Sequence, residues 1–110
     1  METLPVLFRV IGGEVLALFP TVPEQCGSDH MVESYAHVGQ HGAASVELTR
    51  LGRRATPAEY APLLRELRAI YERALAPGDT RYRLRVMERF NRRAYQAARA
   101  QLHADGHAQR

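Results

Sequence analysis

Residues 6–19 read VLFRVIGGEVLALF, and this stretch decides the fold. Two runs rich in β-branched and aromatic residues, 6–11 and 14–19, flank Gly12 and Gly13. A two-residue loop between strands needs positive φ angles, which glycine adopts at no steric cost. The stretch therefore predicts a β-hairpin. Both faces of its strands are largely apolar, so we expect a layer of helices to cover one face and a second copy of the chain to cover the other.

Turn-forming residues between 20 and 29 predict a loop after the hairpin. Residues 31–38, MVESYAHV, predict a third strand because apolar and polar positions alternate. The glycines around residues 39–42 then indicate a turn. Residues 44–49 fit either a fourth strand, with Val46 and Leu48 on one face, or a short helix.

A helix is predicted to begin at Thr56, because Thr56, Pro57 and Glu59 form the pattern of an N-cap, a first-turn proline and a capping box. An apolar stripe at helical spacing continues to about residue 74, and Pro62 predicts a kink in it. Residues 81–86, RYRLRV, alternate strictly between arginine and apolar side chains, which predicts a strand with Tyr82 on its buried face. A last helix is expected over about 88–103.

This order of elements predicts an α+β fold. We expect an antiparallel sheet of four to five strands, in the order ββββαβα, with two helices packed on one face. Residues 1–103 are expected to form one domain, because the length suits a single hydrophobic core. Residues 104–110 are expected to form a frayed tail.

Charge is divided along the chain. Residues 1–49 carry one arginine and six acidic residues, a net charge of −5, whereas residues 50–110 carry fourteen arginines and six acidic residues, a net charge of +8. Every basic residue is an arginine, which suits the recognition of phosphate or carboxylate groups but is also typical of a compositional bias. The division indicates a partner of opposite charge, either a polyanion or another copy of the chain.

The arginines between residues 81 and 93 are the strongest candidate for a binding surface. Alternate side chains on a strand emerge about 6.5–7 Å apart, close to the phosphate spacing of a nucleic-acid strand. The arginines at positions 89, 92, 93 and 99 share one face if residues 88–103 form a helix. The sequence therefore suggests that nucleic acid is bound by Arg81, Arg83, Arg85, Arg89, Arg92 and Arg93.

Two other interpretations of these arginines stay open. They can form a solvated strand edge and helix face, where charge discourages edge-to-edge aggregation. They can also pair with the acidic half of the chain, within the molecule or in a homodimer. No helix-turn-helix, zinc-finger or RNA-recognition motif is present, and no aromatic side chain is placed among the exposed arginines.

The segment SYAHVGQHG, residues 34–42, is a second candidate site for a small ligand or for acid–base chemistry, through His37, Gln40 and His41. On a straight strand the two histidines stand about 13 Å apart, which is too far to share a metal ion. A site that also includes Cys26 and His30 is conceivable, but we predict no metal and no cofactor. A hairpin with a purely structural role explains the same residues.

The sequence shows no catalytic constellation that supports a definite reaction, so an enzyme is the less favoured class. The lone Cys26 excludes an internal disulfide framework, and its acidic neighbours disfavour a thiolate nucleophile. No apolar run approaches the roughly 20 residues of a membrane span. The N-terminal residues METLPVLFRV do not have the pattern of a secretory signal. We therefore expect a cytoplasmic binding or accessory module that contacts no membrane.

Three motifs, FRVIGGEVLALFP, ESYAHVGQHGAAS and ATPAEYAPLLREL, carry a resemblance over roughly residues 7–90. They resemble a family of small uncharacterised bacterial proteins that also occur in phage-like and mobile-element contexts. The resemblance implies a real folded domain. No activity is known for that family, so it implies no mechanism, and no functional residue is carried over from it.

Overall fold

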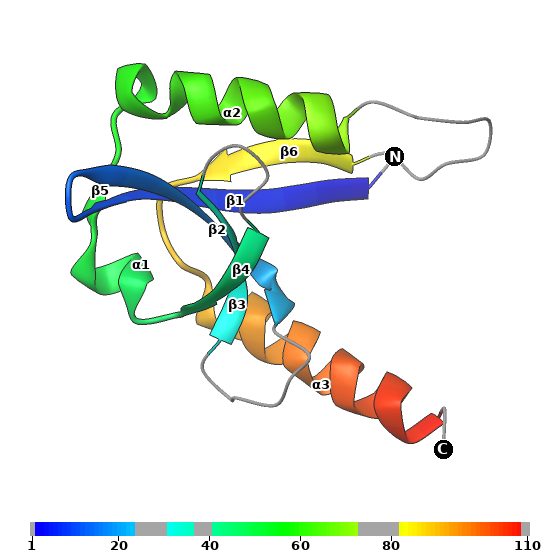
Figure 1. Ribbon diagram of the computed structural model, residues 1–110. Coiled ribbons are helices and arrows are strands. Elements are labelled where there is room, and N and C mark those ends of the chain that lie inside the picture. Colours follow the sequence, from blue (N-terminus) through cyan, green and yellow to red (C-terminus); the bar gives the residue numbers. More distant parts are fainter. Residues whose placement is uncertain (1, 24–30, 37–40, 73–81, 109–110) are drawn as a thin grey trace.

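The structure is a computed structural model that describes residues 2–23, 31–36, 41–72 and 82–108 (Figure 1). Its elements follow the order β1 (Glu2–Ile11), β2 (Glu14–Pro23), β3 (Met31–Tyr35), β4 (His41–Ser45), α1 (Leu48–Leu51), β5 (Arg53–Arg54), α2 (Pro57–Tyr71), β6 (Tyr82–Met87) and α3 (Arg92–Ala108).

One sheet contains all six of these strands. Four neighbours lie in the order β4-β3-β2-β1 and pair antiparallel. Two strands share the other side of β1: β6 pairs with residues 2–7, and the short β5 pairs with Arg9 and Val10. The β1–β6 pair is parallel and β1–β5 is antiparallel. The prediction of an α+β fold with a mainly antiparallel sheet is confirmed.

The predicted hairpin of β1 and β2 is confirmed. Gly12 and Gly13 have φ angles of 59° and 83°, and Ile11 pairs with Glu14 directly beside the turn. β2 continues beyond the expected loop boundary at Pro20 and ends at Pro23, with a register shift between Phe19 and Pro23. The shift accommodates the proline-rich end of the strand because proline cannot donate a ladder hydrogen bond.

The two alternatives for residues 44–49 are both realised in part. β4 occupies His41–Ser45, and the chain then turns into α1. Gly52 ends α1, and its N–H donates to the Leu48 carbonyl at 3.0 Å. The chain then passes directly into β5, so α1 and β5 lie together at one end of β1 (Figure 1).

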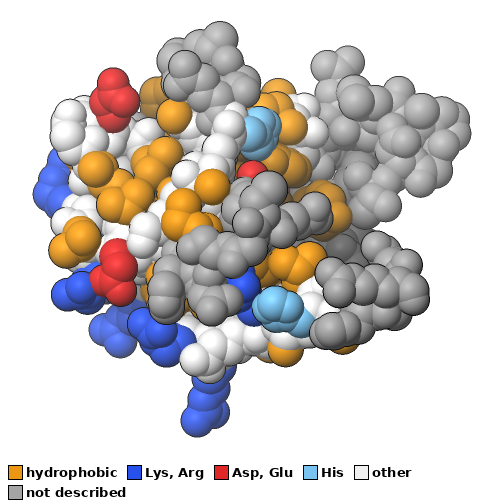
Figure 2. Space-filling model, turned by 60° about the horizontal axis from the view of Figure 1, so that its bottom comes forward, with side chains coloured by type: hydrophobic (Ala, Val, Ile, Leu, Met, Phe, Trp, Pro, Cys, Tyr) orange, Lys and Arg blue, Asp and Glu red, His pale blue; other side chains and the backbone are white. Residues whose placement is uncertain are grey.

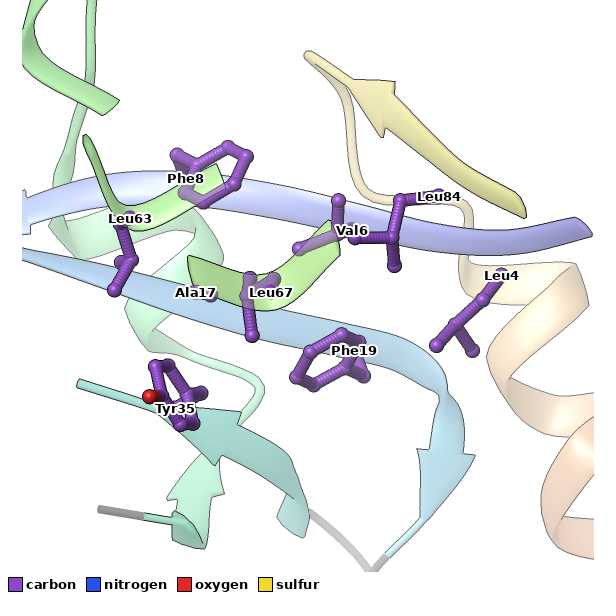
Figure 3. Close-up of a cluster of buried hydrophobic side chains, with 9 residues drawn as sticks. All are labelled: Leu4, Val6, Phe8, Ala17, Phe19, Tyr35, Leu63, Leu67 and Leu84. Atoms are coloured by element: carbon purple, nitrogen blue, oxygen red, sulfur yellow. The ribbon is translucent and has the colours of Figure 1, made fainter. Parts of the chain in front are cut away.

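The helices cover opposite faces of the sheet, which differs from the expected arrangement on one shared face. On one face, Leu63 and Leu67 of α2 pack on alternate residues of β1 such as Val6 and Phe8 (Figure 3). On the other, Tyr95 of α3 packs with a second apolar cluster. That cluster consists of Leu18, Val32, Ala44 and Val46. Both faces of the central strands are apolar, so each face is covered by a helix of its own.

Helix α2 begins as predicted. Glu59 N–H donates to Thr56 Oγ1 at 3.3 Å, and Thr56 N–H donates to Glu59 Oε1 at 2.8 Å, which completes the capping box. The helix runs through Pro62 to Tyr71, with Glu72 as its C-cap. β6 also has its predicted alternation, with Leu84 buried and Arg83 and Arg85 exposed.

Helix α3 begins at Arg92, four residues later than expected, and extends to Ala108. Asn91 sets its start, because Asn91 Oδ1 accepts a 3.0 Å hydrogen bond from the backbone N–H of Ala94. Phe90 therefore lies in the connection between β6 and α3. Among the described helices, none is both long enough and apolar enough to cross a membrane.

Candidate anion-binding site

Arg9 is the unusual residue of the sheet, because it is a charged side chain that is only 3% exposed. It lies on the face of β1 that α3 covers, since side chains alternate and its neighbour Phe8 faces α2. Nε donates to the Thr49 carbonyl at 2.8 Å, Nη1 to the Phe8 carbonyl at 3.1 Å and Nη2 to the Glu88 carbonyl at 2.7 Å. The guanidinium thus joins β1, α1 and the β6–α3 connection.

A second arginine lies directly beside Arg9. Arg54 of β5 is its partner in the antiparallel ladder, so both side chains emerge on the same face of the sheet. Burial, and secondarily the positive charge of Arg54, lower the pKa of Arg9. The pair places two guanidiniums at the end of β1, where α1 approaches.

A pocket of about 390 Å³ opens at this point. Its described lining comes from β1, α1, β5 and the start of the α3 segment, and includes Glu47 and Phe90. Five arginines line it: Arg9, Arg50, Arg54, Arg89 and Arg92. The volume lies in the range of small-ligand sites, about 300–1,000 Å³.

Positive charge exceeds negative charge in this pocket. The described lining carries five arginines and one carboxylate, that of Glu47, which pairs with Arg50 at 2.5 Å. Glu88 approaches Arg54 only to 3.8 Å, and its side chain is 82% exposed. Among the described residues, neither Arg89 nor Arg92 forms an ion pair. The lining is therefore suited to an anion.

The start of α3 adds to the positive potential. Arg92 and Arg93 occupy its first turn, which contains no acidic residue. The N-terminal end of a helix carries partial positive charge and favours acidic side chains, so two arginines there are electrostatically unfavourable. Figure 2 turns the bottom of Figure 1 forward and shows arginine side chains gathered at the lower left, with an acidic side chain beside them.

The arginines that were predicted to form one surface lie in different places in the structure. Arg89 and Arg92 line the pocket. Arg83 and Arg85 are exposed on β6, on the same face of the sheet as Arg9, but do not line the pocket. Arg93 is exposed outside its lining, and Arg81 lies outside the described residues.

Arg99 does not belong to the exposed helix face on which it was expected. It is 8% exposed, and its Nη2 lies 3.4 Å from Nε2 of His103. Arg99 follows Tyr95 by four residues, so the two side chains share the face of α3 that packs on the sheet. Arg99 therefore lies on the inward side of α3, and the expectation that it belongs to a solvated arginine face was wrong.

Sequence reasoning missed Arg9, Arg50 and Arg54 as site residues. The only signal for Arg9 was a charge inside the apolar run of residues 6–11, where a buried arginine requires partners. Arg50 and Arg54 belong to a charged segment between predicted elements, and their position depends on the pairing of β5 with β1.

The histidine site is described only in part. His37 and Gln40 lie outside the described residues, as do Cys26 and His30. His41 is exposed, its Nε2 lies 3.0 Å from Tyr71 Oη, and its ring contacts Tyr35 edge-on at 4.7 Å. Within the described part of the chain, no three potential metal ligands of the His, Cys, Asp or Glu type come together. His41 therefore belongs to an aromatic cluster beyond the end of α2.

Comparison of the chain with protein-family models, with curated proteins and with solved structures finds no match in any of the three. The resemblance to a bacterial family stays a prediction. The candidate function consequently rests on the geometry of the arginine pocket.

Proposed function

We propose that this protein binds the sugar–phosphate backbone of a nucleic acid, with one phosphate group held in the arginine pocket. The observation that carries the proposal is that five arginines line one pocket whose described lining has a single carboxylate. A planar guanidinium matches two phosphate oxygens at once, so several around one concavity favour phosphate over a spherical anion such as chloride.

Arg9 supports the proposal through its unused donors. A guanidinium has five N–H groups. Three are bound to backbone carbonyls, which leaves two without a partner among the described residues. The three carbonyls fix the side chain before a ligand arrives, so little conformational entropy is lost when a phosphate binds. Arg9 is therefore a preorganised donor in the wall of the pocket.

A bound phosphate also reduces unfavourable electrostatics in the free protein. Arg9 and Arg54 repel each other, and Arg92 stands at the positive end of α3. A phosphate placed among these groups neutralises part of their charge and interacts favourably with the helix end. Repulsion between like charges that a ligand can relieve is expected at functional sites.

The exposed arginines of β6 extend the positive surface toward neighbouring phosphates. Arg83 and Arg85 lie on the sheet face that carries the pocket, spaced as alternate residues of a strand. β6 is an edge strand in the described sheet, so these two arginines also discourage edge-to-edge association. For that reason the proposal places the binding energy in the pocket, with Arg83 and Arg85 as secondary contacts.

The test is a fluorescence-anisotropy titration with short labelled oligonucleotides, single-stranded and duplex, at about 50 and 200 mM salt. We expect binding that weakens steeply with salt. Arg54→Ala and Arg89→Ala should each weaken it about tenfold, because each removes a charge-assisted hydrogen bond. The matched control is Arg65→Ala, an exposed arginine of α2 on the opposite face of the sheet.

Two results would contradict the proposal. One is the absence of binding to any oligonucleotide at low salt. The other is an equal loss of affinity in Arg54→Ala and Arg65→Ala, because that would place the charge effect outside the pocket. Displacement of the labelled oligonucleotide by inorganic phosphate or by a mononucleotide then shows whether the pocket recognises a nucleic-acid backbone or a small phosphate compound. If a mononucleotide binds as tightly as an oligonucleotide, the ligand is a small phosphate compound.

Self-association is the second candidate function, and β4 is the observation that favours it. β4 ends the described strand order, and its sequence HGAAS contains no Asp, Glu, Lys or Arg. His41, Gly42 and Ala43 are exposed. An edge strand without charge is a template for pairing with another strand, so two copies could join through β4. Ala43→Lys should then convert a dimer into a monomer in light scattering, whereas a wild-type monomer would exclude this interface.

A further inference from the structure

Phe90 is the one aromatic side chain in the described lining of the arginine pocket. It lies between Arg89 and Arg92 in sequence, and both of these arginines line the pocket as well. The sequence placed no aromatic side chain among the exposed arginines, because Phe90 fell inside the helix expected over about 88–103. In the structure α3 begins only at Arg92, so Phe90 precedes the helix and lies at the pocket.

The Phe90 ring is half-buried, because it packs against the apolar cluster of Tyr95 and also lines the pocket. The centroids of the Phe90 and Tyr95 rings are 5.8 Å apart, with an interplanar angle of 50°. Tyr95 is itself only 4% exposed, so it positions the Phe90 ring and offers no surface of its own to a ligand. Phe90 thus presents an anchored π surface to the pocket.

Arg92 lies over the Phe90 ring, but farther away than direct stacking requires. Its Cζ is 5.9 Å from the ring centroid, whereas carbon atoms in van der Waals contact are about 3.5–4.0 Å apart. A flat group between the ring and the guanidinium needs two such spacings, about 7–8 Å. Arg92 would have to move outward by only about 1–2 Å to admit it. Its side chain is exposed and forms no ion pair among the described residues, so little opposes that movement.

The pocket also has more room than one phosphate group needs. Its volume of about 390 Å³ lies in the range of sites that hold whole small molecules. The arginines of its lining suit an anionic group, and Phe90 suits a flat apolar one. A nucleotide carries both, a phosphate and a base, joined by a sugar.

We propose that the pocket holds a whole nucleotide of a single-stranded nucleic acid, with its base stacked between the Phe90 ring and the Arg92 guanidinium. Unpaired bases stack on aromatic rings and on guanidinium planes. A base in a duplex must first be unpaired and unstacked, which costs free energy, so single strands are favoured. This inference rests on the proposed function, because the phosphate of the same nucleotide is held by the pocket arginines.

The test is an anisotropy titration with three labelled ligands: a single-stranded oligonucleotide, an abasic strand of the same length and charge, and a duplex. Wild-type protein should bind the single strand about tenfold more tightly than the abasic strand, because only the former can stack. Phe90→Leu, which keeps an apolar side chain, should remove that difference and leave binding to the abasic strand and the duplex unchanged. Tyr82→Leu, on a half-buried ring of β6 outside the pocket lining, is the matched control and should preserve the difference.

Phe90→Tyr keeps the ring and should keep the preference for the single strand. The inference is overturned if the wild type binds the abasic strand as tightly as the strand with bases, or if Phe90→Leu weakens binding to both strands equally. In either case a loss of affinity in Arg54→Ala would still support phosphate binding in the pocket, so the proposed function would stand. If the wild type binds none of the three ligands at low salt, the proposed function fails, and this inference fails with it.

Discussion

Arg9 Nη2 donates a 2.7 Å hydrogen bond to the backbone carbonyl of Glu88, a residue 79 positions further along the chain. The same guanidinium also binds the carbonyl of Thr49 in α1. One buried side chain therefore connects the first strand to two segments that come much later in sequence. Because Arg9 also lines the arginine pocket, the group that holds these segments together is available to the ligand that we propose.

Replacing Arg9 should destabilise the protein. Arg9→Ala leaves the carbonyls of Thr49, Phe8 and Glu88 without this donor, and we expect a loss of about 2–4 kcal/mol in the free energy of unfolding. Arg9→Lys should recover only a part, because one ammonium group cannot reproduce the planar fork. Urea unfolding measures both, with Arg65→Ala as the control. A loss as small as that of the control would show that the three hydrogen bonds do not stabilise the fold.

Gly52 should not tolerate a side chain. A Cβ at this position would lie 2.9 Å from Arg9 Cβ, 2.9 Å from Ile11 Cγ1 and 3.0 Å from the Leu48 carbonyl oxygen. Gly52→Ala must therefore push α1 away from β1, and we expect it to cost about 1–3 kcal/mol. It should also weaken oligonucleotide binding, because Gly52 lines the arginine pocket.

Gly42→Ala is the matched control for this substitution. A Cβ at Gly42 would meet only Ser34 Oγ, at 4.0 Å. Thermal unfolding of the two variants should therefore separate them clearly. Similar unfolding midpoints would contradict the close packing of α1 on β1.

The ion pair between Arg53 and Glu59 should make stability depend on pH in acid. Hydrogen bonds from Arg53, and secondarily from the Thr56 backbone, lower the pKa of Glu59 from 4.5 to about 2. Folding thus favours the ionised carboxylate. Its contribution to stability is present above pH 4.5 and is lost as the pH falls toward 2.

Glu59→Gln removes the titrating carboxylate. Unfolding free energies measured between about pH 2 and pH 7 then test the predicted dependence on pH. The difference in unfolding free energy between wild type and Glu59→Gln should be constant above about pH 5 and should shrink below it. Glu14→Gln, on an exposed carboxylate, is the control. A difference that does not change between pH 5 and pH 2 would contradict the lowered pKa.

Replacing Arg92 or Arg93 with Glu should change the stability of the protein in the same direction but should weaken oligonucleotide binding to different extents. Replacing either with Glu places an acid in the first turn of α3, which should stabilise the free protein by about 0.3–1 kcal/mol. For Arg92 the loss of its contact with the Phe90 ring, at 5.9 Å, offsets part of the gain. Only Arg92 lines the pocket, so Arg92→Glu should weaken oligonucleotide binding far more than Arg93→Glu. Equal losses of affinity would place the phosphate outside the pocket.

The features that the sequence predicted correctly depend on local interactions. The turn at Gly12 and Gly13 needs positive φ angles, and the capping box of Thr56 and Glu59 forms within four residues. The alternation of β6 also follows from neighbouring positions. Each of these patterns is complete within a short stretch, so the sequence alone indicated the hairpin, the start of α2 and the last strand.

The features that the sequence did not predict depend on tertiary packing. Tyr95 and Arg99 are four residues apart on α3, but which side of the helix faces the sheet depends on its packing against the apolar surface around Leu18. The arginine pocket combines residues 9, 50, 54, 89 and 92, which come together only when β5 and β6 pair with successive parts of β1. No local pattern encodes that pairing.

The most direct test of the arginine pocket is an NMR titration that follows the arginine Nε–Hε resonances as a short oligonucleotide is added at low salt. We predict that the resonances of Arg9, Arg54, Arg89 and Arg92 shift together and saturate at one affinity. Arg65 and Arg68 of α2 should not move, because they lie on the other side of the sheet. Shifts confined to arginines outside the pocket, or no shift at any arginine, would contradict the proposal that this pocket binds a phosphate group.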